Sequence, residues 1–455
     1  MGQSVLYFHR SMKALKTQSP KIYNAIKQEE KRQKEVLEMI ASENYTSTAV
    51  IETLGSVFTN KYSEGYPKRR YYQGNAVVDI VESYAQDLAK KLFGFPLVIV
   101  QPCSGSPANA AIWMALLKNN QKLMGLALDQ GGHITHGLEI GFSGRFFKTA
   151  HYKVSPKTGQ LDYKEVEEVA LKEKPDLIIC GYTAYPRIID FAKFRKIADK
   201  VGAWLVADVS HIAGLIAGGA HPSPVPYVDV VMTTTHKTLR GPRGAMIMVT
   251  ERGLKRDPEL GKKIDAAVFP GLQGGPHDNQ TAAIAVALEE ASKASFKKYA
   301  AQIVKNAQKL AETLTKNGLD LVSGGTDNHL ILVDLQKQQV SGKIAAEALE
   351  IADIVLNFSL VPYDPMPPFY TSGIRIGTPA LTTRGMKEKD MVKVGNWIAQ
   401  VIEEVKGYTL PADKEGRLEL LRKFRSEIIK NKKLLAIQKE VTSFAKKFPV
   451  PGIDA

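Results

Sequence analysis

Two charged residues follow apolar runs of the sequence, and their types suit chemistry on a carbonyl compound. Lys237 follows the apolar residues 230–232 in Thr-His-Lys-Thr, and neighbouring hydroxyls with partial burial would make its amine nucleophilic. Taken singly, a lysine after a strand is usually a surface residue. Asp208 follows the apolar residues 204–207 and would either cap the next helix or hold a cationic nitrogen of a ligand.

A third segment has the character of a phosphate site. Ser104, Gly105 and Ser106 come after the apolar residues 98–100 and before a helix expected over 110–117, with Ser106 as a plausible N-cap. Small residues at a helix start leave backbone N–H groups free to hold a phosphate. Taken alone, an ordinary capped helix is the better interpretation. Taken with Lys237 and Asp208, the set meets the needs of pyridoxal phosphate, namely a Schiff-base lysine, a carboxylate for the pyridinium nitrogen and a phosphate cradle.

The elements that position these residues follow from the spacing of apolar residues. Between residues 78 and about 280, helical patterns alternate with short apolar runs, which predicts an α/β fold with a mostly parallel sheet flanked by helices. Ligands of such sheets lie beyond the carboxyl ends of the strands, where all three candidate segments fall. The expected strands are residues 98–100, 177–180, 204–207, 230–232 and 245–249.

The pattern changes on either side of this region. A charged helix is expected over 18–42, and beyond about 290 a long helix (297–317), a strand (330–334) and a helix from 341 indicate a small α+β domain. A basic helix is expected over 415–447. The predicted organisation is an N-terminal helical arm (1–60), a large domain (61–288), a small C-terminal domain (289–409) and a basic helical tail (410–455).

Composition excludes several classes of protein. The chain has 455 residues, 44% apolar and 24% charged, as in soluble globular proteins, so collagen-like, disulfide-scaffold and disordered classes are excluded. Two cysteines, Cys103 and Cys180, fit a reducing compartment. The longest apolar run near the amino end is residues 5–8, and no run approaches the ~18 residues of a membrane span. We expect a soluble, cytoplasmic protein without a membrane partner.

The net charge of +14 raises the alternative of nucleic-acid binding. Residues 1–32 carry seven Lys and Arg against two acids, and residues 411–455 carry eleven against six. Most of the excess therefore lies at the two ends, which is more typical of solvated helix faces. Since no zinc-finger spacing or RNA-binding aromatic motif accompanies it, we expect no specific nucleic-acid partner.

Five longer motifs make the sequence similar to a known family. From about residue 22 to 400 the chain closely resembles the serine hydroxymethyltransferases of bacteria, which have pyridoxal phosphate fold type I with a large and a small domain. The motifs are Ile-Ala-Ser-Glu-Asn-Tyr (40–45), Asn-Lys-Tyr-Ser-Glu-Gly-Tyr-Pro (60–67), Thr-Thr-Thr-His-Lys-Thr (233–238), Ser-Gly-Gly-Thr-Asp-Asn-His (323–329) and Thr-Ser-Gly-Ile-Arg (371–375).

The resemblance implies a role for each matching residue. Lys237 would form the Schiff base, Asp208 would pair with the pyridine nitrogen, and His133 would stack on the ring. Arg375 and Ser42 would bind the amino-acid carboxylate, Arg through two parallel hydrogen bonds. The other implied cofactor residues are Ser104, Gly105, Ser106, Thr183, His211, His236 and, from a partner subunit, Gly275; proton transfer falls to Glu64, with Tyr62, Tyr72 and His211 beside the substrate; folate would meet Leu128, Gly132, His133, Ile134 and Ser359.

The implied reaction is the reversible conversion of L-serine and tetrahydrofolate to glycine and 5,10-methylenetetrahydrofolate. Because Tyr62 and Glu64 act in the neighbouring subunit's site in this family, the resemblance implies a homodimer, with a tetramer left open. No metal is expected. The alternatives are a folate-independent, threonine aldolase-like lyase for β-hydroxy amino acids and a protein without catalysis.

Four departures from the family pattern bear on these roles. Cys103 and Gln130 each replace a histidine, and Ser210 replaces the alanine that faces the pyridine ring. Phe358 and Ser359 replace Lys and Asn in Asn-Lys-Asn, whose last position contacts the pterin. The last departure predicts a raised tetrahydrofolate requirement.

Overall fold

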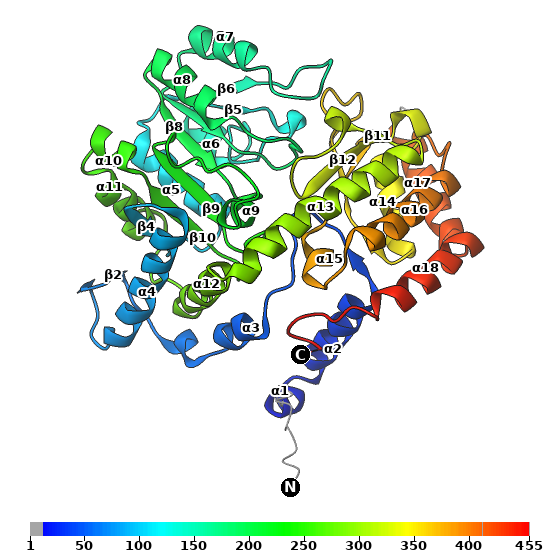
Figure 1. Ribbon diagram of the computed structural model, residues 1–455, viewed down its shortest axis with the longest axis horizontal. Coiled ribbons are helices and arrows are strands. Elements are labelled where there is room, and N and C mark those ends of the chain that lie inside the picture. Colours follow the sequence, from blue (N-terminus) through cyan, green and yellow to red (C-terminus); the bar gives the residue numbers. More distant parts are fainter. Residues whose placement is uncertain (1–11, 412, 455) are drawn as a thin grey trace.

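A computed structural model of the chain describes residues 12–411 and 413–454 (Figure 1). The apolar run 5–8 at the amino end, with the first residues of the expected arm, lies outside these. Two larger sheets organise the rest, one of seven strands and one of four. None of the helices described is long and apolar enough to span a membrane.

The seven-stranded sheet is parallel apart from one strand, β10, which confirms the predicted fold class. Its spatial order is β4-β10-β9-β8-β7-β5-β6, with β10 antiparallel to both of its neighbours. The strands are β4 (Leu97–Ile99), β5 (Lys122–Leu126), β6 (Lys148–Tyr152), β7 (Leu177–Cys180), β8 (Trp204–Asp208), β9 (Val230–Thr234) and β10 (Ala245–Val249).

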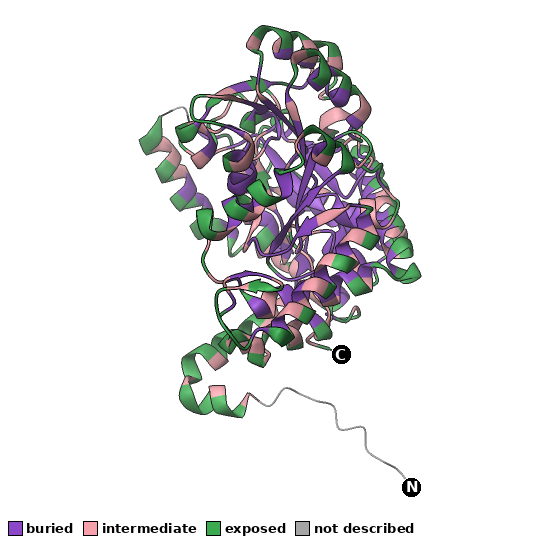
Figure 2. Ribbon diagram, turned by 90° about the vertical axis from the view of Figure 1, so that its left-hand side faces the viewer, coloured by how far each residue is buried: buried purple, intermediate pink, exposed green. Residues whose placement is uncertain are grey.

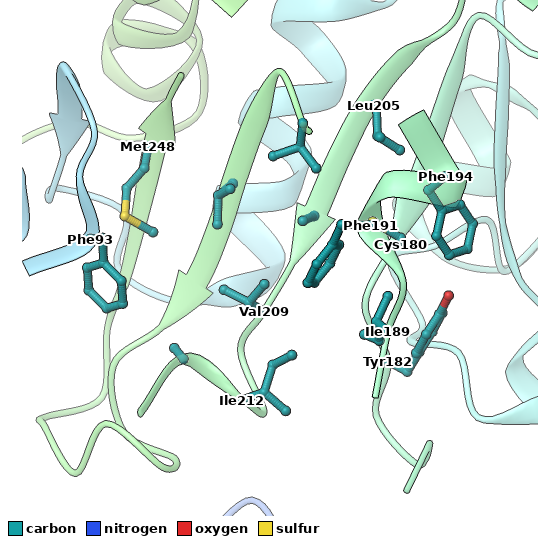
Figure 3. Packing of buried hydrophobic residues seen from close by; sticks show 14 of the residues in the cluster. Phe93, Cys180, Tyr182, Ile189, Phe191, Phe194, Leu205, Val209, Ile212 and Met248 are labelled. Atoms are coloured by element: carbon teal, nitrogen blue, oxygen red, sulfur yellow. The ribbon is translucent and has the colours of Figure 1, made fainter. Parts of the chain in front are cut away.

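Both faces of this sheet are buried under helices, which is why its strands are continuous apolar runs. Successive side chains of a strand point to opposite faces: Ile178 and Cys180 enter one hydrophobic cluster, whereas Leu177 and Ile179 enter another. Figure 3 shows part of the first cluster, with Phe194 near Cys180, and Figure 2 shows buried strands inside exposed helices. The helices of this half are α4 (Ala76–Phe93), α5 (Gly105–Leu116), α6 (Phe142–Phe146), α7 (Tyr163–Glu173), α8 (Phe191–Val201), α9 (Ala213–Ala217), α10 (Glu251–Arg256), α11 (Leu260–Ala266) and α12 (Asp278–Ala291).

The second half is built on an antiparallel sheet in the order β11-β12-β15-β14. The long helix α13 (Ala294–Lys316) runs between the two halves (Figure 1); its Ile303 packs in the core of the large sheet and its Leu310 in the core of the small one. The other elements are β11 (Asp320–Leu321), β12 (Leu330–Asp334), β14 (Asn357–Ser359), β15 (Gly373–Gly377), α14 (Gly342–Ile351), α15 (Pro379–Thr383), α16 (Glu388–Glu404), α17 (Lys414–Ile428) and α18 (Lys432–Ala445).

The amino-terminal segment differs from the single helix expected over 18–42. After α1 (Lys13–Gln18), helix α2 (Pro20–Glu35) ends seven residues early. The next residues form β1 (Leu37–Glu38), which pairs in parallel with β13 (Ile354–Val355). Leu37 and Met39 are fully buried in the small-domain core, so tertiary packing overrides the local helical pattern. The chain then crosses to α3 (Thr48–Leu54) and to the hairpin of β2 (Gly65–Tyr66) and β3 (Arg69–Arg70).

The carboxyl-terminal segment also differs in detail from its prediction. The one helix expected over 415–447 is two, because α17 ends at Ile428 and Asn431 starts a new helix, α18, by accepting from the Lys433 and Leu434 N–H groups. Both helices pack apolar residues, among them Phe424 and Val441, into the core of the small half. Only their outer faces carry the basic residues that dominate this part of the sequence.

Candidate active site

A cavity of about 290 Å³ lies at the carboxyl ends of the parallel strands, where the sequence placed the candidate site. A more open cavity of about 740 Å³ lies near the opposite ends of the strands, around Arg195 and Arg256, and contains none of the predicted residues. Predicted residues that line the 290 Å³ cavity are Ser42, Ser104, Gly105, Ser106, His133, Thr183, Asp208, His211, His236, Lys237 and Arg375.

Lys237 lies three residues beyond β9, in the turn that follows the strand. Its Nζ donates to Thr234 Oγ1 at 2.8 Å. Burial lowers the pKa of Lys237 to about 8; the charges of Arg243 and Arg375 act in the same direction, and Asp208 opposes them. A substantial fraction of the amine is therefore neutral near physiological pH, as a nucleophile requires.

Asp208 is the last residue of β8 and is buried. Its Oδ2 accepts from Asn109 Nδ2 at 3.0 Å and lies 3.2 Å from His136 Nε2, and its Oδ1 accepts from the Ser210 N–H. Burial alone would raise the pKa of this carboxyl, but the His136 and Ser210 hydrogen bonds and the nearby histidines lower it well below its usual range. Asp208 is thus a buried anion that faces the cavity.

Three histidines of the cavity are held neutral. Burial lowers the pKa of His133 to about 4 and that of His236 to about 3. Burial, with the charge of Lys237, also lowers the pKa of His211 well below its usual range. His133 Nδ1 lies 2.8 Å from Thr135 Oγ1, and His211 Nδ1 lies 3.2 Å from Nε2 of His329 behind it. These rings therefore act as uncharged surfaces and hydrogen-bonding groups.

The helix start after β4 differs by a few residues from the predicted one. Helix α5 begins at Gly105 with Ser104 as its N-cap, so Ser106 lies inside the first turn and is not the cap. The first N–H groups of a helix have no partner within it and are free for an anion. A Cβ at Gly105 would come within 2.8 Å of Thr234 Cγ2, so the close approach of this turn to β9 requires glycine.

Arg375, in the middle of β15, is contributed to the cavity by the small half of the molecule. Its Nη1 donates to the Thr183 carbonyl at 2.9 Å and its Nε donates to Asn357 Oδ1 at 3.2 Å. Burial lowers the pKa of Arg375 to about 10, so the group stays charged at neutral pH. With two donors engaged, the remaining N–H groups are available to a carboxylate.

A second group of predicted residues lies together but does not line this cavity. Glu64 Oε2 accepts from Tyr72 Oη at 3.1 Å, and the rings of Tyr62 and Tyr72 meet edge to face at 5.6 Å. A Cβ at Gly275 would touch the Tyr62 ring at 3.1 Å. Tyr62 is 57% exposed and Tyr72 46%. The chain thus gathers Tyr62, Glu64, Tyr72 and Gly275 on its own surface.

The residues predicted to meet folate are distributed over two segments. Leu128 and Ile134 are exposed on the loop that carries His133 into the cavity, with Gly132 just before it. Ser359 lies on β14 opposite Gly373, and its Oγ donates to the Leu360 carbonyl at 3.2 Å. Phe358, next to it, is partly exposed.

Sequence reasoning missed several side chains that shape the site. Asn109 and His136 both bond Asp208, Thr234 accepts from Lys237, and Arg243 and Asn357 add charge and polarity. Two of these residues could have been found from the sequence, because His136 follows His133 by three residues and Asn109 directly precedes the helix expected to bind phosphate. The other contacts depend on strand neighbours that are far apart in sequence.

The residues fit pyridoxal phosphate. The free helix start at Gly105, the buried carboxylate of Asp208, the partly neutral amine of Lys237 and the uncharged ring of His133 face one cavity. Asn109 Oδ1 and His236 Nδ1, both buried, lack a partner among the described residues, which marks unused polar capacity at this site. Fold and site together define a pyridoxal phosphate-dependent enzyme of fold type I.

Comparison with known proteins identifies the family. The family model described as serine hydroxymethyltransferase matches residues 15–398. A protein of that name from Desulfotalea psychrophila is 51% identical over 98% of this chain and 97% of its own length. Another from Acidothermus cellulolyticus is 51% identical over 97% of this chain and 98% of its own, and one from Nostoc is 52% identical over 90% and 94%.

The chain belongs to the serine hydroxymethyltransferase family. Membership confirms the predicted enzyme class, a glycine hydroxymethyltransferase that uses pyridoxal phosphate as cofactor and tetrahydrofolate as co-substrate. The two alternatives, a folate-independent lyase and a protein without catalysis, are not favoured.

Proposed function

We propose that the reversible transfer of the hydroxymethyl group of L-serine to tetrahydrofolate takes place in the 290 Å³ cavity, with Lys237, Asp208 and Arg375 as its principal residues. The observation that carries this proposal is the convergence of the three side chains, from the turn after β9, from β8 and from β15, on one cavity. A neutral amine, a buried anion and a buried guanidinium are the groups that a cofactor-bound amino acid needs.

The cofactor would be held at both of its ends. The N–H groups of Gly105 and Ser106 would bind the phosphate, with Ser104 beside them, and Gly275 would join them from a partner subunit. Asp208 would accept a hydrogen bond from the protonated pyridine nitrogen. His133 and Thr183 would flank the ring, and His211 and His236 would lie near it. When bound, pyridoxal phosphate supplies an electron-withdrawing ring that stabilises negative charge at the α-carbon of the amino acid.

The chain's own residues would bind serine and move its protons. Arg375 would bind the carboxylate of serine through its free N–H groups, with the Ser42 hydroxyl as a further donor. The neutral fraction of Lys237 would exchange with the amino group of the substrate. Glu64, supported by the Tyr72 hydroxyl and Tyr62, would accept or return a proton at the serine hydroxyl.

The proposed active unit is at least a homodimer with shared sites. Tyr62, Glu64 and Tyr72 are absent from the lining of the chain's own cavity, and they lie in a stretch with unusually exposed side chains, including Val57 at 78% and Tyr71 at 71%. A partner that covers this stretch would bury those side chains and receive Glu64. A tetramer is compatible with this arrangement.

Three further proposals concern folate, compartment and domains. Leu128, Gly132, His133, Ile134 and Ser359 would line the pterin site, which is supported by the closeness of the His133 loop to the cavity. The cytoplasm is the proposed compartment because both cysteines are free thiols. The domain limits 1–60, 61–288, 289–409 and 410–455 stay a proposal, which the two separate hydrophobic cores support; the tail shares the core of the small domain, and the start of α13 packs in that of the large one.

The test measures serine cleavage by the purified chain with and without tetrahydrofolate, with Lys237→Ala as the matched variant. We expect rapid, folate-dependent formation of glycine by the wild-type chain and none by the variant. Equal rates without folate would replace the proposal by a lyase activity, and turnover by folded Lys237→Ala would remove this lysine from the reaction.

A further inference from the structure

Asn44 lies at the junction of the three segments that carry proposed substrate and cofactor residues. It comes two residues after Ser42, where the chain crosses from the small half to the large one between α2 and α3 (Figure 1). Its Nδ2 donates to the backbone carbonyl of Lys237 at 2.9 Å. Its Oδ1 accepts from Thr383 Oγ1 at 2.7 Å, at the end of helix α15, which begins two residues after the strand of Arg375.

A third partner closes these bonds into a ring. Asn44 Nδ2 also donates to the Tyr299 hydroxyl at 2.8 Å, and that hydroxyl lies 2.9 Å from Thr383 Oγ1. Because Thr383 gives its only hydroxyl hydrogen to Asn44, Tyr299 must donate to Thr383, its other acceptor being the Pro379 carbonyl at 3.5 Å. Amide, phenol and threonine hydroxyl then form a cycle in which every bond runs in the same sense, an arrangement that strengthens each member.

The amide of Asn44 has no spare capacity. An asparagine side chain has two N–H donors and an oxygen with two lone pairs. The donors serve Lys237 and Tyr299, and the oxygen accepts from Thr383 and from the Tyr45 N–H at 2.9 Å. The assignment of nitrogen and oxygen is thereby fixed, since a flipped amide would place an acceptor against the Lys237 carbonyl.

The Lys237 turn is held from both sides. Inside the turn, the carbonyl of Lys237 also accepts from the Arg240 N–H at 3.0 Å. Outside it, the Arg240 guanidinium lies over the Tyr299 ring at 5.1 Å. Any shift of Asn44 therefore moves the backbone that carries Lys237 relative to the neighbouring segments of Ser42 and Arg375.

We propose that Asn44 is a positioning residue, whose side-chain amide sets where Lys237 stands relative to Ser42 and Arg375. The inference rests on the role proposed for Lys237. It assigns Asn44 no contact with substrate: the amide acts through the backbone of Lys237. A misplacement of about 1 Å between reacting groups is enough to lower a rate by a large factor.

The test compares Asn44→Leu with Asn306→Leu, two changes that remove an amide of similar size without adding charge. Asn306 is a matched control because its Nδ2 also donates to the α15 region, to Thr382 Oγ1 and the Met386 carbonyl, both at 2.9 Å, but not to Lys237. Three quantities are measured on folded protein: kcat and KM for folate-dependent serine cleavage, and the pH midpoint of the visible absorbance of the lysine-bound cofactor.

We expect Asn44→Leu to lower kcat about tenfold or more, to change the KM for serine less than kcat, and to shift the pH midpoint. Asn306→Leu should lower thermal stability. Its kcat should stay within about twofold of the wild-type value, and its pH midpoint should equal the wild-type midpoint within error. Unchanged kcat and midpoint in Asn44→Leu, or the same changes in Asn306→Leu, would overturn the inference.

A second pair covers the case in which Asn44→Leu does not fold. Thr383→Val removes the hydroxyl that donates to Asn44, and Thr382→Val removes the hydroxyl that accepts from Asn306. The inference requires a lowered kcat in the first variant only, and equal effects would overturn it. Lys237→Ala is assayed alongside: if it still cleaved serine, the proposed function would fail as well, whereas a dead Lys237→Ala beside an unchanged Asn44 variant overturns only this inference.

Discussion

The reactivity of Lys237 depends on charges that surround its amine. Burial contributes most to a pKa lowered to about 8, and Arg243 and Arg375 repel the ammonium form while Asp208 attracts it. Because the neutral amine is the nucleophile, covalent capture of pyridoxal phosphate by the cofactor-free chain should accelerate as the pH rises through 8 and level off above it. Asp208 stays ionised over this range, so the profile reports the lysine.

The first prediction tests one of these charges. Arg243→Gln removes a repelling charge, so the pKa of Lys237 should rise and the midpoint of the capture rate should move to higher pH. Stopped-flow absorbance between pH 6.5 and 10 measures the midpoint. Arg252→Gln, an exposed arginine near the opposite cavity, is the control and should leave it in place. A midpoint that stayed fixed or fell in Arg243→Gln would show that its charge does not act on the amine.

The second prediction concerns folate and Ser359. Its hydroxyl hydrogen is directed at the Leu360 carbonyl, so the side chain offers a ligand only an acceptor, whereas asparagine would offer a donor as well. One hydrogen bond contributes about 0.5–1.5 kcal/mol, so Ser359→Asn should lower the half-saturating tetrahydrofolate concentration roughly threefold to tenfold. Titration at saturating serine measures it, with the half-saturating serine concentration as an internal control. An unchanged folate titration would mean that this position does not contact the pterin.

At the scale of elements, the sequence predicts best what burial on both faces determines. The bounds of β7 and β10 agree with the expected runs because every residue of these strands is buried. β5 and β6 were missed: each begins with a lysine, β5 contains Gly125, and β6 alternates exposed and buried residues at an edge of the sheet. The local pattern of apolar residues also does not indicate which strands are neighbours in the sheet.

The same distinction applies to the site. Lys237 and Asp208 were predictable because each lies at or just beyond the end of a strand, and parallel strands end at one edge. The bonds of Asn44 to Lys237 and Thr383 join residues 193 and 339 positions apart, and no spacing along the chain encodes them. The contacts of Arg384 are likewise not encoded by spacing along the chain, because they join helices from the two ends of the chain.

The third prediction is that Arg384 holds those ends together. Its buried guanidinium donates to the carbonyls of Lys34 and Val36 at the end of α2, and to those of Ala445 and Phe448 at the end of α18. Helix ends leave such carbonyls without partners, and a buried unpaired acceptor costs roughly 1–3 kcal/mol. Arg384→Met should therefore lower the free energy of unfolding by about 3 kcal/mol or more in urea titrations.

The control for Arg384 is an arginine whose partner is at the surface. Arg425 is half exposed and pairs with Glu347, a kind of ion pair that contributes about 1 kcal/mol or less. Arg425→Met should change the unfolding free energy by no more than that. Equal effects of the two substitutions would show that the Arg384 contacts add nothing specific to the joining of α2 and α18.

At the scale of the whole molecule, the proposed sites are completed by a second copy of the chain. The cavity supplies Lys237, Asp208 and Arg375, whereas Glu64 and Tyr72 bond each other outside it, on a stretch with exposed aromatic side chains. A two-fold symmetric pair would place each Glu64 in the other copy's cavity, because a two-fold interface repeats every contact twice. The last prediction follows from this geometry.

Inactive Lys237→Ala and inactive Glu64→Ala chains should regain activity when their subunits exchange. In a mixed dimer, one site receives both substitutions and the other has both native residues, so a 1:1 mixture should recover about a quarter of the wild-type activity. The control mixes Lys237→Ala with Asp208→Ala, two residues of the same cavity, and every mixed site then keeps one substitution and stays inactive. Labelled subunits confirm exchange by energy transfer. Confirmed exchange with activity at background in the first mixture would contradict shared sites, and recovery in the control would show that Lys237 and Asp208 do not belong to one site.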